Sequence, residues 1–209
     1  MVLDRPSVCQ DCQVGRHKQG VATRQRLVVV ATRLFGESGF DAVAIPEVLD
    51  HAGVSRGALY HHFPSKEALF EAVLEDVEAH VAQELLKASG ATSDPQAALQ
   101  AGCRAFIRLV RTPTIRQIVL VDAPSVVGWA RWREIDERHA FGLMKGAVEA
   151  LASEGRIPST SVDVVTHMLL AALMEVALLV ARDHDPLSLR RGEQALKLLL
   201  ERTFTPSPR

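Results

Sequence analysis

The segment that most constrains this chain is residues 52–63, AGVSRGALYHHF, in which a glycine and a serine separate two short helical patterns. Gly53 ends the apolar-periodic stretch 45–52, and glycine readily takes the left-handed conformation that closes a helix. Ser55 is a typical N-cap, because its hydroxyl can accept a hydrogen bond from a backbone N–H two or three residues on. We therefore expect two helices joined by a tight turn, with Val54 filling the corner between them.

The two faces of the second helix differ in chemistry. Leu59 and Phe63 lie four residues apart and are expected to face the core. The outer face carries Arg56, Ala58, Tyr60, His61 and His62, and no acid interrupts it. Such a surface suits contact with phosphates and base edges. The pattern indicates a helix-turn-helix that binds DNA.

The next helix opens with a cation in an unusual place. Ser65 can cap this helix, and Lys66 falls in its first turn. The free N–H groups and the positive end of the helix dipole favour an anion there. Lys66 gains nothing from that dipole, so a DNA phosphate is the partner that explains it.

Residues 23–74 resemble the DNA-binding domain of the TetR family of transcriptional regulators. The matching positions are Ala31, Leu34, Phe35, Gly39, Phe40, Ala52, Gly53, Val54, Ser55, Gly57, Leu59, Tyr60, His62, Phe63, Lys66, Glu67 and Leu69. So many spaced matches disfavour the alternative, an ordinary antiparallel helix pair. The resemblance implies a sequence-specific DNA-binding regulator, most simply a repressor.

The resemblance also suggests roles on the DNA-binding surface. Ser55, Tyr60, His62 and Lys66 are expected at phosphates. Arg56 and His61 are expected at base edges, where an arginine can bond guanine O6 and N7 together. The full expected set is Ser55, Arg56, Gly57, Ala58, Tyr60, His61, His62 and Lys66, with Ala44 and Arg24 beside them.

Residues 43–44 depart from the family pattern. Val43 and Ala44 stand where the family commonly has Thr followed by Ser or Thr. The missing hydroxyls remove an N-cap and one phosphate contact, a loss of about 1 kcal/mol. Pro46 partly compensates, because it pre-sets the helical backbone angle near the first position.

Apolar periodicity predicts an all-α fold of about nine helices, with no strand signal. Residues 1–20 are expected to form a flexible arm, residues 21–81 a DNA-binding domain with its helix-turn-helix at 44–63, and residues 82–209 a ligand-sensing and dimerisation domain. Helices are expected at residues 21–37, 45–52, 55–63, 65–87, 95–110, between Pro113 and Pro124, and at 126–152, 162–182 and 186–204.

Charge is distributed unevenly along the chain. The net charge is -1 and the pI about 6.7, which alone argues against a nucleic-acid partner. Residues 16–66, however, hold seven Lys or Arg against four acids, whereas residues 67–209 hold 16 against 19. The positive charge therefore gathers on the part that carries the DNA-binding motif.

The last two predicted helices are too apolar for a solvated face. Residues 168–181 are apolar around almost the whole helix, which requires burial on all sides. A second copy of the chain is the expected cover, since regulators of the TetR type pair through such helices, although burial within one subunit is the alternative. The interface is expected at Met168, Leu173, Val176, Leu179, Leu189, Leu196, Leu199 and Leu200. A two-fold dimer places its reading helices about 34 to 36 Å apart in the simplest case, so the operator should be an inverted repeat.

A small-molecule site is expected inside residues 95–185. Trp129 and Trp132 lie three apart, in a segment that resembles one subset of TetR C-terminal domains without naming a ligand. Two such rings suit a flat or greasy molecule, while polar groups would fix its orientation. The candidates are Phe106, Asp122, Trp129, Trp132, Phe141, Met144, His167 and Glu175. Core packing is the alternative for the aromatic residues and methionines.

Other functions have weaker signals. Cys9, Cys12 and His17 could begin a metal or redox site, but no second ligand pair follows. A redox- or metal-responsive regulator is therefore the alternative, with Cys103 expected as a small core residue. No catalytic or phosphate-binding motif is present, so neither an enzyme nor a cofactor is expected.

The N-terminus has no signal-peptide pattern. The apolar stretch 168–181 is 14 residues long and contains Glu175, which we take as too short and too interrupted to span a bilayer. The expected location is the cytoplasm.

Overall fold

The computed structural model describes residues 10–183 and 185–204, and every regular element in these ranges is helical. The all-α fold class is confirmed, since 83% of the structure is helical and the described residues contain no strand. These ranges hold ten helices, one more than expected, when the three consecutive segments from Pro113 to Val126 are taken as one and the three-residue 3-10 turn Ser159–Ser161 is left out.

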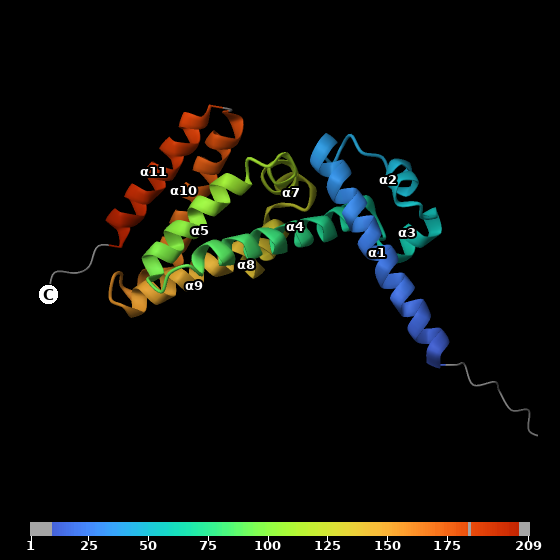
Figure 1. The fold of residues 1–209 in the computed structure, drawn as a ribbon, viewed down its shortest axis with the longest axis horizontal. Helices are drawn as coiled ribbons and strands as arrows, with labels where there is room; N and C mark the ends of the chain where they lie inside the picture. The colour runs from blue at the N-terminus through green and yellow to red at the C-terminus, as the bar shows by residue number, and fades with distance from the viewer. Residues whose placement is uncertain (1–9, 184, 205–209) are drawn as a thin grey trace, which may run out of the picture.

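Three helices form one end of the molecule (Figure 1): α1 (Gln10–Ser38), α2 (Ile45–Ala52) and α3 (Arg56–His62). Their shared core is aromatic, with the ring centroids of Phe35, Phe40 and Phe70 lying 5.2 to 5.6 Å apart. Such tilted and edge-on pairs are the favoured aromatic geometries. These contacts join α1 to the helix that begins at Lys66.

The turn between α2 and α3 follows the sequence prediction. Gly53 takes φ 61° and ψ 39°, the left-handed conformation. Ser55 caps α3, because its Oγ accepts a 3.2 Å hydrogen bond from the N–H of Ala58. Leu59 is fully buried and Val54 packs against the core. The predicted helix-turn-helix geometry is confirmed.

Helix α4 (Lys66–Ser89) runs from α3 into the rest of the protein, as the green helix in Figure 1 shows. Ser65 caps it, accepting a 3.1 Å hydrogen bond from the N–H of Ala68. The predicted domain boundary at residue 81 falls inside this continuous helix. A displacement at one end of α4 is therefore carried to the other.

The remaining helices form the rest of the molecule (Figure 1). They are α5 (Pro95–Leu109), α6 (Pro113–Ile115), the π-helix η1 (Arg116–Asp122), α7 (Ala123–Val126), α8 (Trp129–Arg138), α9 (Ala140–Ser153), the 3-10 turn η2 (Ser159–Ser161), α10 (Val162–Arg182) and α11 (Pro186–Thr203). The predicted cap of α5 is confirmed, because Asp94 Oδ2 accepts a 2.9 Å hydrogen bond from the N–H of Ala97.

Two predicted helix boundaries were wrong. The single helix expected at residues 126–152 is divided into α8 and α9 at His139, whose φ of -121° and ψ of -108° are not helical. The helix α1 begins at Gln10, so residues 10–20, expected in a flexible arm, are helical. Residues 1–9 lie outside the described residues.

Helix α10 carries a longer apolar segment than the stretch 168–181 considered from the sequence. Residues Ser159–Arg182 form a 24-residue segment whose most apolar window has a mean hydropathy of 2.2, long and apolar enough for a membrane span by length and composition. The argument that the stretch is too short was therefore wrong. Leu169, Leu173 and Ala177 are nevertheless buried in the protein core, and one such helix is weak evidence for a membrane protein.

Candidate DNA-reading surface and ligand pocket

Helix α3 presents the predicted reading residues on its outer side. Arg56, Gly57, Tyr60 and His61 are exposed, with Tyr60 44% accessible. Nothing lies within 4 Å of a Cβ placed on Gly57, so space is open there. Ala58 and His62 are half-buried. The chemistry that could contact a DNA groove is therefore gathered on one short helix.

Two cations flank this surface on aromatic faces. Lys66 Nζ lies 4.1 Å from the centroid of Phe40, and Arg24 Cζ lies 5.1 Å from that of Phe63. A cation over a ring gains attraction from its negative face. Lys66 thus has a partner within the protein, which sequence reasoning missed. The exposed Ala44 is the N-cap of α2 and makes no side-chain cap, as its missing hydroxyl predicts.

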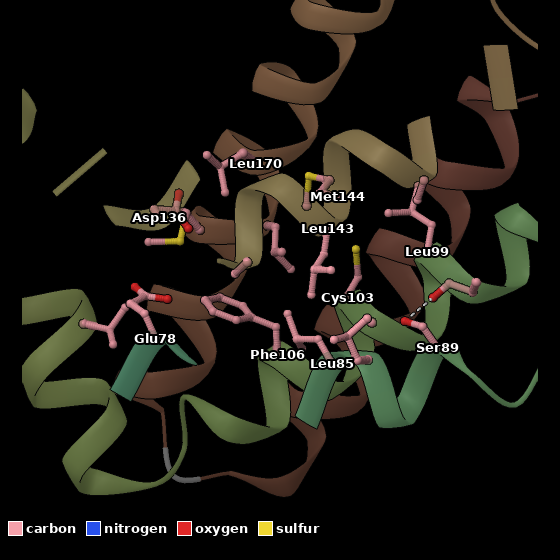
Figure 2. A pocket seen from close by; sticks show the side chains of 18 of the residues that line it. Glu78, Leu85, Ser89, Leu99, Cys103, Phe106, Asp136, Leu143, Met144 and Leu170 are labelled. Atoms are coloured by element: carbon pink, nitrogen blue, oxygen red, sulfur yellow. Dashed lines mark hydrogen bonds between the residues drawn. The ribbon is translucent and has the colours of Figure 1, made fainter. Parts of the chain in front are cut away.

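A deep apolar pocket lies at the distal end of α4, between α4, α5, α8, α9 and α10 (Figure 2). The cavity has a volume of about 120 Å³. Ligand sites are typically lined by apolar and aromatic side chains with a few convergent polar groups. Its lining is Glu78, Leu85, Leu86, Ser89, Ala98, Leu99, Gly102, Cys103, Phe106, Val119, Trp132, Asp136, Ala140, Leu143, Met144, Ala147, Leu170, Leu173 and Met174.

Two carboxyl groups from different helices lie at the same end of this pocket (Figure 2). Burial, reinforced by the nearby charges of Asp136 and Glu75, raises the pKa of Glu78 to about 8. Burial also raises the pKa of Asp136 to about 6, although Arg133 opposes that shift. Glu78 and Asp136 are 1% and 6% exposed. Sequence reasoning named neither of them.

Three of the predicted ligand residues line this pocket: Phe106, Trp132 and Met144. Trp132 is buried, and its Nε1–H has no hydrogen-bond partner among the described residues. Cys103 is buried as expected and also lines the pocket, and burial raises the pKa of its thiol to about 12. The thiol is therefore neutral at physiological pH.

The other five predicted ligand residues lie outside the pocket. Trp129 is 61% exposed and stacks at 4.8 Å on Trp132. Phe141 is buried against the exposed His167, at 5.0 Å between ring centroids. Glu175 is exposed rather than buried, because it lies on the outer face of α10. Their assignment to this pocket is corrected accordingly.

The fifth, Asp122, links the two halves of the molecule. Its Oδ2 accepts a 2.8 Å hydrogen bond from the N–H of Phe40, and its Oδ1 accepts a 2.9 Å bond from Gln117 Nε2. A Cβ on Gly36 would lie 2.6 Å from Thr114, so α1 and α6 touch through that glycine. The end of α1 is thereby joined to the π-helix that follows α6.

The predicted dimer residues divide into two groups. Met168, Leu179 and Leu199 are exposed, and Val176 and Leu189 are half-buried. Leu173, Leu196 and Leu200 are instead buried within the single chain, so their assignment to the interface is corrected. The exposed faces of α10 and α11 add Val164, Leu187 and Leu198.

The metal or redox alternative cannot be placed on the structure. Cys9 and the side chains of Cys12 and His17 lie outside the described residues. Among the side chains that are described, no group of three or more His, Cys, Asp or Glu could hold a metal ion. The alternative stays a sequence-based prediction.

A three-helix unit with an exposed, arginine-bearing α3, joined by one long helix to a helical domain with a pocket, defines a helix-turn-helix DNA-binding regulator. Residues 27–73 match the family model described as bacterial regulatory proteins of the tetR family, and residues 96–203 match the tetracyclin repressor-like C-terminal domain. The chain belongs to the TetR family of transcriptional regulators.

Known relatives cover most of the chain. The TetC protein of transposon Tn10 from Escherichia coli is 26% identical over 75% of this chain and 79% of its own length. The crystal structure of a TetR-family transcriptional regulator from Pectobacterium atrosepticum is 30% identical, with a TM-score of 0.76 over 92% of this chain and 98% of that chain. The structure of RolR in complex with the ligand resorcinol, 19% identical, has the same fold, with a TM-score of 0.69 over 92% and 98%.

Proposed function

We propose that this regulator is a homodimeric repressor that leaves an inverted-repeat operator when a small hydrophobic or aromatic ligand binds. The observation that carries the proposal is the pocket in the distal domain, built mainly from apolar side chains. A cavity with this lining suits such a ligand. The resorcinol complex of RolR, a protein of the same fold, is consistent with an aromatic ligand here.

The pocket and the reading helix share one structural element. Helix α4 begins at Lys66, directly after α3, and contributes Glu78 and Leu85 to the pocket. Between these points Arg131 Nε of α8 donates a 2.8 Å hydrogen bond to Glu71 of α4. A ligand that binds one arrangement of α4 and α8 more tightly than another therefore shifts the position of α3. The change in operator affinity is limited by the ligand's difference in affinity for the two arrangements.

Dimerisation is supported by apolar side chains that the single chain leaves uncovered. Met168 is 66% exposed on α10, and Leu179 of the same helix is 56% exposed. On α11, Leu187 and Leu198 are 50% and 56% exposed. Several exposed apolar side chains on two neighbouring helices favour an interaction site, and a four-helix contact with a second copy would cover them.

The proposal is tested by selecting DNA fragments from the source organism with the full-length protein and sequencing them with and without cell extract. An inverted repeat should be enriched, and extract should reduce its recovery. The absence of any enriched sequence contradicts operator binding.

A pocket-filling variant locates the ligand. Ala147→Phe should select the same DNA and respond little to extract, because Ala147 lines the pocket and lies far along the chain from α3. Ala91→Phe, at an exposed loop position, is the control and should respond normally. Equal responses of both variants would place the ligand elsewhere.

A further inference from the structure

The polar groups of the pocket differ in whether they have partners. Ser89 Oγ donates a 3.1 Å hydrogen bond to the carbonyl of Ala98, drawn in Figure 2 at the opposite end of the pocket from Glu78. Asp136 Oδ2 lies 3.4 Å from Arg133 Nη1. Within the part of the chain that the structure describes, the carboxyl group of Glu78 has neither a hydrogen bond nor an ion pair. Glu78 is therefore the carboxyl group of the pocket that has no partner among the described residues.

The charged groups around Glu78 come from α4 and from the α8–α9 corner. Glu75 is one turn earlier on α4, where it pairs with Arg138 and His139 at 2.6 and 3.3 Å. Arg133 is held by Asp136 and by the rings of the two tryptophans. Helices α5, α9 and α10 contribute only uncharged side chains to the lining. Each nearby cation thus contacts a carboxylate other than Glu78.

We propose that the pocket binds an amphiphilic cation, an ammonium-type group on an apolar or aromatic body, with Glu78 as its counter-ion. The inference rests on the proposed function, because it names the ligand class of the same pocket. A buried polar group without a partner is costly, and a cation would remove that cost by pairing with it. Phe106 and Trp132 place aromatic rings in the same lining, which suits an organic cation.

Binding would exchange a cation for a proton. Burial raises the pKa of Glu78 to about 8, so the empty pocket holds a protonated carboxyl at neutral pH. The arriving ammonium group replaces that proton, which leaves to solvent. Affinity for a permanently charged ligand therefore rises with pH up to about 8 and then levels off. An uncharged alcohol, which needs no ionised carboxyl, lacks this rise.

The test is calorimetric titration of the full-length protein, without DNA, using 4-butylbenzyltrimethylammonium and the uncharged 4-butylbenzyl alcohol. The ammonium compound should bind more tightly than the alcohol. Glu78→Gln should weaken the ammonium compound by at least about tenfold, abolish its pH dependence and leave the alcohol little changed. Glu78→Asp, which retains the charge, should keep the preference for the cation.

Two controls keep the result specific. Glu75→Gln removes an acid one turn away that already has partners, so it should change ammonium affinity little. Thermal unfolding at pH 7 should show Glu78→Gln folded, since it replaces a carboxyl that is already protonated. If Glu78→Gln is unstable, the preference shown by Glu78→Asp and the pH profile of the wild type decide the question.

The cation proposal and the repressor proposal can fail independently of each other. Equal or tighter binding of the alcohol, an unaffected Glu78→Gln, or no binding of the ammonium compound overturns the cation assignment. Each result leaves operator selection and its response to extract intact. An absence of operator selection overturns the repressor proposal, whatever the pocket binds.

Discussion

The N–H of Phe40, just after α1, donates a 2.8 Å hydrogen bond to Oδ2 of Asp122 in the last turn of the π-helix. The two residues are 82 positions apart in the chain, and this bond ties the end of α1 to the C-terminal domain. Oδ1 of the same carboxylate accepts a second hydrogen bond, from Gln117. Both oxygens of a buried carboxylate are thus used at the junction.

Asp122→Asn should destabilise the protein. Asn offers one uncharged acceptor oxygen in place of the two carboxylate oxygens, so the hydrogen bonds to Phe40 and Gln117 are weakened or rearranged, at a cost of roughly 1 kcal/mol. Urea unfolding followed by circular dichroism measures the change in the free energy of unfolding. Asp41→Asn, at an exposed neighbouring position, is the control. An unchanged midpoint for Asp122→Asn would contradict the structural role of this bond.

The stability of the ligand-free protein should decline as pH rises from 6 to 8. Burial raises the folded-state pKa of Glu78 from 4.5 to about 8, so the folded state holds a proton that the unfolded state has lost. That stabilisation is present at low pH and disappears as pH rises through 8, by at most about 1.4 kcal/mol per pH unit. Asp136 acts in the same direction up to about pH 6.

Glu78→Gln isolates this contribution, because its amide does not titrate. Chemical unfolding at several pH values should show a smaller decline for the variant than for the wild type. Parallel stability profiles for the two proteins would mean that Glu78 does not hold a raised pKa in the folded state.

Lys66→Ala should weaken binding to every DNA sequence by a similar factor. The substitution removes one phosphate contact from each subunit, and each contact contributes about 0.9 to the slope of log affinity against log salt, so the slope for the dimer falls by about 1.8. Fluorescence anisotropy at several salt concentrations gives this slope. Lys87→Ala, at the far end of α4, is the matched control and should leave it unchanged. An unaltered slope for Lys66→Ala would leave the lysine only its contact with the ring of Phe40.

Arg56→Ala should instead relax the choice of sequence. An arginine paired with guanine contributes about 1 to 3 kcal/mol of discrimination. At one base pair in each half-site, operators that carry different bases should therefore bind Arg56→Ala with similar affinity. Uniform weakening across all variants would reassign Arg56 to the DNA backbone.

Leu179→Glu should convert the dimer to a monomer, because it places a charge on the exposed apolar face of α10. Analytical ultracentrifugation measures the mass directly. Val29→Glu is a matched control, since Val29 is 57% exposed on α1 and Leu179 is 56% exposed. A dimer that persists in Leu179→Glu would place the interface on another surface.

The helix-turn-helix could be predicted from sequence because its determinants are local. Gly53 and Ser55 set the turn through their own backbone and hydroxyl, and Leu59 follows from helical spacing. Lys66 was predicted at the DNA surface, but its contact with Phe40 was not, because that ring comes from a distant segment.

The pocket was predicted only in part because it depends on how separate helices pack. We expected Trp129 and Trp132 to share one ligand site. Gly128, the N-cap of α8, has φ 78°, and Trp129 lies exposed in the first turn of that helix. Glu78 had a usable signal: it lies four residues after Leu74 and three before Val81, on the buried face of α4. A carboxyl at such a position is a strong candidate for a binding site.

The outward-facing residues of the proposed dimer surface could not be predicted from sequence. Helix α10 is apolar on nearly every side, so periodicity cannot separate its inner from its outer face. Leu173 faces the core and Leu179 faces solvent, and only the packing of α10 against α5, α9 and α11 distinguishes them.

Two copies of α3 that read one inverted repeat should leave two protected half-sites, related by two-fold symmetry, in hydroxyl-radical footprinting of the wild type on an enriched fragment. Both protections should be lost together in Leu179→Glu. Protection of one half-site alone, equally strong in Leu179→Glu, would show that a single copy of α3 binds the DNA.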